Sequence, residues 1–139
     1  MSFEYEIEND FKELLKGLTD NIYAVSSAGD KRKYPCIAIK LDKTEDAGFN
    51  GAPIFFGDVL LIPTTYRSND KTGVALDDLI NRLHELIYSG TQLDQLRAAA
   101  VSGFNYYSWQ NLDGYNSDDI DTRQTTLQVR ISFSPPSIN

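Results

Sequence analysis

The 139-residue sequence has one cysteine, one histidine and no long apolar run. A single cysteine, Cys36, excludes an internal disulfide framework and a cysteine-based zinc site. The longest apolar runs, at 59–62 and 98–101, are far shorter than the roughly 20 residues that cross a bilayer. The first residues form neither a basic nor an apolar segment. We therefore expect no secretory signal, no membrane span and a protein that stays in the cytoplasm.

A surplus of basic side chains is also missing, because 13 Lys and Arg stand against 20 Asp and Glu, for a net charge of −7. Such a chain has no excess cations to displace the counterions of nucleic acid or to bind an anionic lipid surface. The hydrophobic fraction of 41% and the charged fraction of 24% are typical of a globular protein. At this length we expect one domain over residues 1–139, with a short flexible C-terminal tail at 134–139.

Two segments have the periodicity of amphipathic helices. Apolar side chains from Ile7 to Leu18 recur at helical spacing and predict a helix over 5–18, with acidic residues near its start where the helix dipole favours them. A second stripe ends before a Ser-Gly pair and predicts a helix over 74–88. The following segment, 91–97, predicts a linker with at most a short helical turn.

Several segments are rich in residues that favour strands. Alternation of apolar and polar residues is strictest in the last of them. Pro63 lies within one strand, and because proline donates no backbone hydrogen bond it indicates an edge position or a bulge. Residues 42–57 are irregular and predict a long surface loop. The predicted strands cover 34–41, 58–66, 100–109 and 124–133, after a short extended run at 22–25.

The last two strands predict an antiparallel hairpin closed by an acidic loop at 111–121. The order of elements is then helix, strands, helix and hairpin. This order predicts an α+β fold, a two-layer sandwich of a mostly antiparallel β-sheet with two α-helices packed on one face.

Candidate catalytic groups are few. His84 lies beside the apolar stripe of the second helix, and no motif supplies the partner that a general base requires. Cys36 lies in an apolar strand, where a thiol behaves as a small hydrophobic side chain, although the basic residues 31–33 precede it. No nucleophile-elbow, P-loop or dinucleotide-binding pattern occurs. We expect no catalytic residue, no cofactor and no enzyme activity.

The acidic loop carries oxygen ligands of the kind that calcium takes, but their spacing does not fit the EF-hand template. We therefore expect no metal site, and the interpretation is a solvated hairpin turn or an interaction surface. The candidate interaction residues are Asp113, Asp118, Asp119 and Asp121.

Four aromatic residues cluster in the strand before this loop. Without a cationic groove they fit cross-strand packing or a protein interface better than stacking on nucleic acid bases. They are Phe104, Tyr106, Tyr107 and Trp109.

The arrangement as a whole resembles the tail terminator, or tail completion and head–tail joining, proteins of tailed bacteriophages. After the leading helix, the Tyr-Pro-Cys-Ile-Ala-Ile segment at 34–39 is similar to the strand that follows the first loop in that family. The strand at 57–62 leads through a loop into the helix at 76–83. An Asp-rich turn precedes the strand at 121–131. The likeness is one of order and pattern, and it covers roughly residues 5–133.

The resemblance implies a structural virion protein without catalytic residues, assembled in the host cytoplasm. Its copies would form a ring, commonly six-fold, that caps the tail tube and meets the head connector, while DNA passes through without specific binding. A head-completion or neck protein is a neighbouring possibility, and a small non-viral binding or scaffold module is another. A ring also needs contacts between subunits, and pairing along the exposed edge of the sheet is one hypothesis for them.

Overall fold

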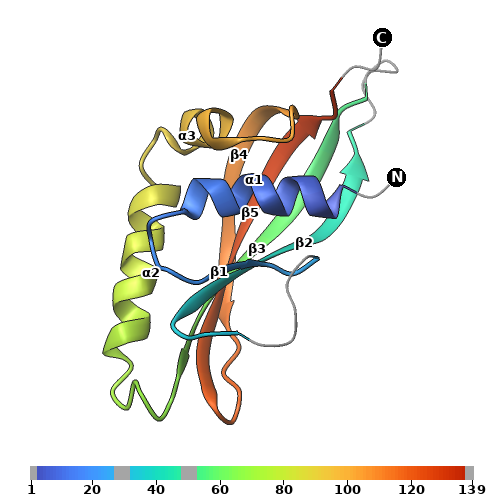
Figure 1. Ribbon diagram of the computed structural model, residues 1–139. Coiled ribbons are helices and arrows are strands. Elements are labelled where there is room, and N and C mark those ends of the chain that lie inside the picture. Colours follow the sequence, from blue (N-terminus) through green and yellow to red (C-terminus); the bar gives the residue numbers. More distant parts are fainter. Residues whose placement is uncertain (1–2, 27–31, 48–52, 137–139) are drawn as a thin grey trace.

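The computed structural model describes residues 3–26, 32–47 and 53–136, which form three helices and one five-stranded sheet (Figure 1). None of the helices in these ranges is long and apolar enough to span a membrane. In chain order the elements are α1 (Glu4–Leu15), β1 (Ile22–Ala24), β2 (Cys36–Asp46), β3 (Phe55–Tyr66), α2 (Val74–Ile87), α3 (Gln92–Ala99), β4 (Asn105–Asn116) and β5 (Thr122–Ser134).

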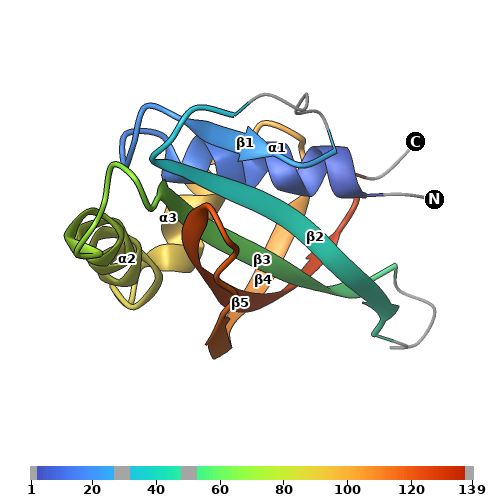
Figure 2. The same cartoon turned by 90° about the horizontal axis from the view of Figure 1, so that it is seen from below.

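The strands lie in the order β1-β2-β3-β5-β4, and all neighbouring pairs are antiparallel except β1 with β2. The helices pack against one face of this sheet and share its core (Figures 1 and 2). The predicted α+β sandwich with a mostly antiparallel sheet is therefore confirmed. The helix layer contains three helices, however, where the sequence predicted two.

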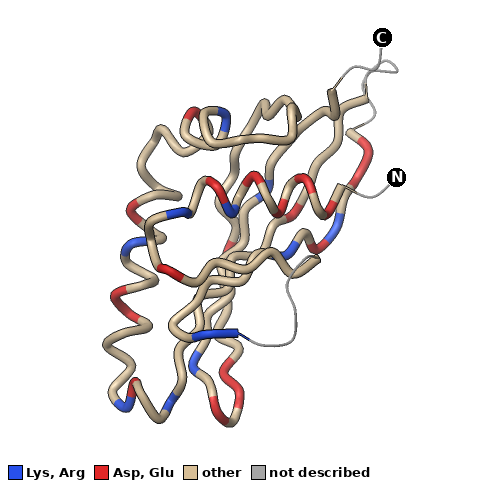
Figure 3. Tube along the Cα trace, in the orientation of Figure 1, with Lys and Arg blue, Asp and Glu red and all other residues tan. Residues whose placement is uncertain are grey.

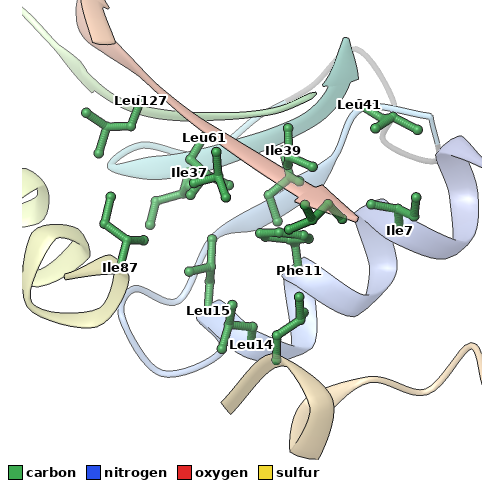
Figure 4. Packing of buried hydrophobic residues seen from close by; sticks show 14 of the residues in the cluster. Ile7, Phe11, Leu14, Leu15, Ile37, Ile39, Leu41, Leu61, Ile87 and Leu127 are labelled. Carbon is green, nitrogen blue, oxygen red and sulfur yellow. The ribbon is translucent and has the colours of Figure 1, made fainter. Parts of the chain in front are cut away.

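The core lies between α1 and the sheet (Figure 4). Ile7, Phe11 and Leu15 of α1 are fully buried, as the helical stripe predicts. Successive side chains of a strand point to opposite faces, so every second residue of the strands meets them; in β2 these residues are Ile37 and Ile39. Each fully buried side chain of this size contributes roughly 1.5–3 kcal/mol relative to its exposed state.

Two predictions about the helices are wrong, one on where the first helix ends and one on the segment after α2. The first helix ends at Leu15, where the prediction was residue 18, because Gly17 has a φ of 101° in the left-handed region. The segment predicted as a linker is the eight-residue helix α3. Its only fully buried residue is Leu96, so the sequence carries little helical periodicity there.

Most of the predicted loop at 42–57 is a hairpin. β2 continues to Asp46 and pairs with the first residues of β3, and a bulge follows Leu41. The end of β2 is exposed on both of its faces, so no alternation of apolar residues marks it as a strand. Residues 48–52 of the predicted loop lie outside the described residues.

Pro63 lies in a central strand, so the predicted edge position is wrong. On one side it pairs with Ile37 of β2. On the other side, the pairing of β3 with β5 omits Ile62 and Pro63 and then resumes at Thr64 in the same register. The missing donor of proline therefore coincides with an interruption of the ladder.

The final hairpin is longer than predicted. β4 spans 105–116, so residues 100–104 of the strand predicted over 100–109 precede it. Half of the expected acidic loop belongs to the strand, and only residues 117–121 connect it to β5. β5 includes Ser134, which is buried, so the C-terminal tail begins after this residue. Residues 137–139 of the expected tail lie outside the described residues.

Candidate functional site

The structure does not bring the two candidate catalytic side chains together. His84 is exposed on α2, where its ring lies 5.6 Å from that of Tyr88. Cys36 is fully buried in β2, and burial raises the pKa of its thiol to about 11. A protonated, buried thiol is a poor nucleophile and fits the predicted role of a small hydrophobic side chain.

Among the residues that the structure describes, four carboxylates are buried, and the sequence analysis did not single them out. Every buried side-chain nitrogen and oxygen atom in the described residues has a hydrogen-bond partner, so none of these carboxylates is left unsatisfied. Among the same residues, no three His, Cys, Asp or Glu side chains gather as a metal site would require. The buried carboxylates are Glu8, Asp10, Asp58 and Asp70.

Asp10 ties α1 to the segment that precedes β4. Its carboxylate accepts hydrogen bonds from the backbone N–H groups of Val101 at 2.8 Å and Ser102 at 3.0 Å. The Ser102 hydroxyl and the Tyr106 hydroxyl donate to its second oxygen. Burial, with the neighbouring Asp10 carboxylate, raises the pKa of Tyr106 far above its ordinary range. The phenol therefore stays a hydrogen-bond donor.

Glu8 joins α1 to the part of the sheet formed by β1 and β2. One carboxylate oxygen accepts from the N–H of Ser26 at 2.8 Å, and the other accepts from the N–H of Leu41 at 2.9 Å. Leu41 lies directly before the bulge of β2, where β1 no longer runs beside it. Glu8 thus satisfies a backbone donor that the sheet itself leaves without a strand partner.

Asp70 caps α2 from the loop before it. Its carboxylate accepts from the backbone N–H groups of Ala75 and Leu76, both at 3.1 Å, and from the Thr65 hydroxyl at 2.9 Å. Burial alone would raise the pKa of this carboxyl, but these three hydrogen bonds and the nearby Arg123 outweigh it and lower the pKa. Because the N-cap position of α2 is Gly73 and Asp70 lies three residues before it, the sequence position of Asp70 carried no capping signal.

The four predicted interaction residues lie on the final hairpin. Asp113 is exposed in β4, and the other three are exposed in the connection to β5. Asp118 accepts from Arg67 at 3.2 Å and from the N–H of Gln124 at 3.1 Å, which holds the turn to neighbouring segments. Between the acids, Ile120 is 85% exposed. This turn therefore offers both negative charge and one apolar side chain to solvent.

Three of the four aromatic residues of the β4 region pack inward. Phe104 packs against Phe133, Tyr106 is buried, and Trp109 stacks on Phe11 with ring centroids 5.5 Å apart. The fourth, Tyr107, is 48% exposed. Most of these rings pack into the core, so they do not form an open platform on which bases could stack. The sequence analysis likewise favoured packing over base stacking.

The outer edge of β4 has, toward each of its ends, a feature that hinders pairing with another strand. Arg97 of α3 donates to the backbone carbonyl of Tyr106 at 2.8 Å, which occupies one acceptor of this edge. Further along, a bulge between Leu112 and Tyr115 includes the exposed Asp113. Bulges and charged residues are devices that hinder pairing with another strand. The structure therefore gives little support to subunit contacts by edge pairing.

The sheet face opposite the helices is the more open surface. Cys36, Ala38 and Leu60 are buried there, outside the main core cluster. From Ile62 to the 117–121 turn, the register places only uncharged side chains of the described strands on this face. They include Ile62, Thr64, Gln124, Thr126 and Tyr115.

The charged side chains of this face lie in its other half. Arg130 forms a two-point contact with Asp58, at 2.8 and 3.2 Å, and Lys43 lies 3.8 Å from the same carboxylate and 3.4 Å from Glu45. Lys40 is exposed beside them. Among the described residues, this face thus carries three cations and two carboxylates, whereas most of the other acidic residues lie on the helices and the turns (Figure 3).

No protein-family model and no curated protein matches this sequence.

Proposed function

We propose that this chain is a structural subunit of a bacteriophage neck or tail, whose copies form a ring that caps the tail tube and joins it to the head connector. The order and pattern of its elements, which resemble those of tail terminator proteins, suggest this class. The observation that carries the proposal is the helix-free sheet face, uncharged over half of its extent in a chain of net charge −7. Depletion of charge is typical of the centre of protein interfaces.

The buried carboxylates support a protein that acts through its shape. Each of them joins two elements of the fold, as Asp10 joins α1 to the start of β4 and Asp70 joins β3 to α2. Such contacts hold the subunit rigid, which suits a component that must match its neighbours. The acidic charge suits a ring around DNA, because a negative channel repels phosphates and lets DNA pass without specific binding. Asp113, Asp118, Asp119 and Asp121 would then face the channel or a neighbouring ring.

The test is assembly. Light scattering after size-exclusion chromatography over a concentration series is expected to show a species of about six subunits, visible as rings by electron microscopy. Added to polymerising tail-tube protein, the chain is expected to stop tube growth. Binding to a head-connector ring without any effect on the tube would favour the head-completion role. A chain that stays monomeric and binds neither partner would overturn the proposal in favour of a scaffold module of another kind.

A further inference from the structure

We infer that neighbouring copies join head to tail, with the helix-free sheet face of one copy packed on the exposed side of α2 of the next. This inference rests on the proposed ring, because it names the two surfaces that join its subunits. The surfaces belong to different elements and lie on different sides of the molecule (Figure 2).

The distribution of charge indicates which surface of a second copy fits the sheet face. Each copy has a net charge of −7, so two copies repel each other unless the contact joins unlike charges. On the sheet face, exposed Lys40 has no carboxylate within ion-pair distance among the described residues. On α2, the exposed Asp77, Asp78 and Glu85 likewise have no cationic partner in the described ranges. The sheet face of one copy therefore complements α2 of another.

Apolar surface is present on both sides of this contact. The centre of the sheet face holds Ile62 and Leu112, which are half-buried in the single chain. The two ends of α2 hold Val74 and Tyr88, with 59% and 62% of their surface exposed.

The edges of the sheet favour this arrangement over strand pairing. Arg97 and the bulge around Asp113 hinder the pairing of another strand with the outer edge of β4. At the other edge of the sheet, β1 pairs with β2 as far as Ile39. Beyond this point the backbone N–H of Leu41 donates to Glu8, so it is not available to another strand. A contact between two different surfaces repeats from copy to copy and forms a ring when its rotation closes, whereas a contact between two identical surfaces stops at a dimer.

Two charge-reversal variants test the contact. Lys40→Glu alters only the sheet face, and Asp77→Lys with Asp78→Lys alters only α2. Each variant alone is expected to self-associate at least about tenfold more weakly than the wild type, because like charges then meet in the contact. Mixed together, they are expected to assemble again in a one-to-one ratio, because the intact α2 of the first fits the intact face of the second and the two reversed surfaces carry unlike charges. Lys12→Glu and Asp20→Lys, which change exposed residues outside both surfaces, are the matched controls.

Sedimentation velocity at low and high salt separates the outcomes. Assembly of the wild type, loss of assembly in each variant and recovery of assembly in the one-to-one mixture would support the contact. Rings that form equally well from both variants would refute it and leave the proposed ring standing. Dimers of the α2 variant alone would show a face-to-face contact and refute it as well. A wild type that stops at a dimer would overturn the ring, whereas a mixed assembly of the two variants would still support the contact. A monomeric wild type overturns both.

Discussion

The Tyr106 hydroxyl donates a 2.5 Å hydrogen bond to the carboxylate of Asp10, although the two residues lie 96 positions apart in the chain. The same carboxylate binds the N–H groups of Val101 and Ser102. One buried acid of the first helix thus positions the whole segment that leads into β4. The loss of this acid therefore affects stability far more than the loss of an exposed one.

Asp10→Ala is expected to lower the free energy of unfolding by about 3 kcal/mol or more, because several buried donors lose their acceptor. Tyr106→Phe keeps the ring and is expected to cost about 1–2 kcal/mol. Urea unfolding followed by circular dichroism measures both. Glu4→Ala, at an exposed position of the same helix, is the control and is expected to change stability by less than about 0.5 kcal/mol. Equal effects in the three variants would contradict the role of Asp10.

Gly114 allows the backbone of β4 to approach β5 closely. A Cβ atom at this position would lie 2.6 Å from the carbonyl oxygen of Thr126. Gly114→Ala is therefore expected to destabilise the chain by about 1–3 kcal/mol through forced backbone movement. Thermal unfolding measures the effect, and Asp113→Ala, at the exposed neighbour, is the control. An alanine variant as stable as the wild type would show that the hairpin accommodates a side chain here.

Asp70 makes stability depend on acid pH. Its pKa lies below the ordinary 3.8 in the folded chain, so its contribution is complete above that value and is lost as pH falls through the lower folded pKa. Asp70→Asn is expected to be less stable than the wild type at pH 7. Urea unfolding between pH 7 and pH 2 is expected to show this gap narrowing below about pH 4. A gap that does not change with pH would contradict the prediction.

Cys36 is expected to resist thiol reagents in the folded chain. A thiol pKa of about 11, two units above its ordinary 9.0, lowers the thiolate fraction about a hundredfold at neutral pH, and burial blocks access. Reaction with a chromogenic disulfide at pH 8 is expected to be at least about a hundredfold slower in native protein than in denaturant. Rapid native reaction would show that β2 opens readily.

Replacing Asp118, Asp119 and Asp121 together by Asn is expected to leave the monomer folded, because exposed charges contribute little to stability. The pair between Arg67 and Asp118 is lost, at a cost of about 1 kcal/mol or less. Circular dichroism checks folding, and light scattering checks assembly. A variant that fails to fold would make the turn a structural element and no longer a candidate contact.

Periodic segments were predictable, and segments exposed on both faces were not. The stripe from Ile7 and the one from Leu76 located α1 and α2 because each helix buries a single face. The end of β2 after Leu41 and the second half of β4 carry few buried residues, so no apolar pattern marked them as strands. Pro63 suggested an edge because sequence alone cannot show where a ladder is interrupted.

The burial of the acids was not predictable. Asp70 lies three residues before Gly73, the N-cap residue of α2, so its position in the sequence carried no capping signal. Asp10 lies three residues after Ile7 and four before Leu14, which places it on the apolar stripe, but nothing local shows that it is buried or what binds it. Its donors come from residues 101–106.

The sequence by itself determined the fold class, the two long helices, part of each long strand and the acidic balance, because each follows from local periodicity or composition. Only the tertiary structure decided which carboxylates are buried, which sheet face stays bare and how the β4 edge is guarded. These features depend on groups that lie far apart in the chain and meet only when the sheet and the helices pack together.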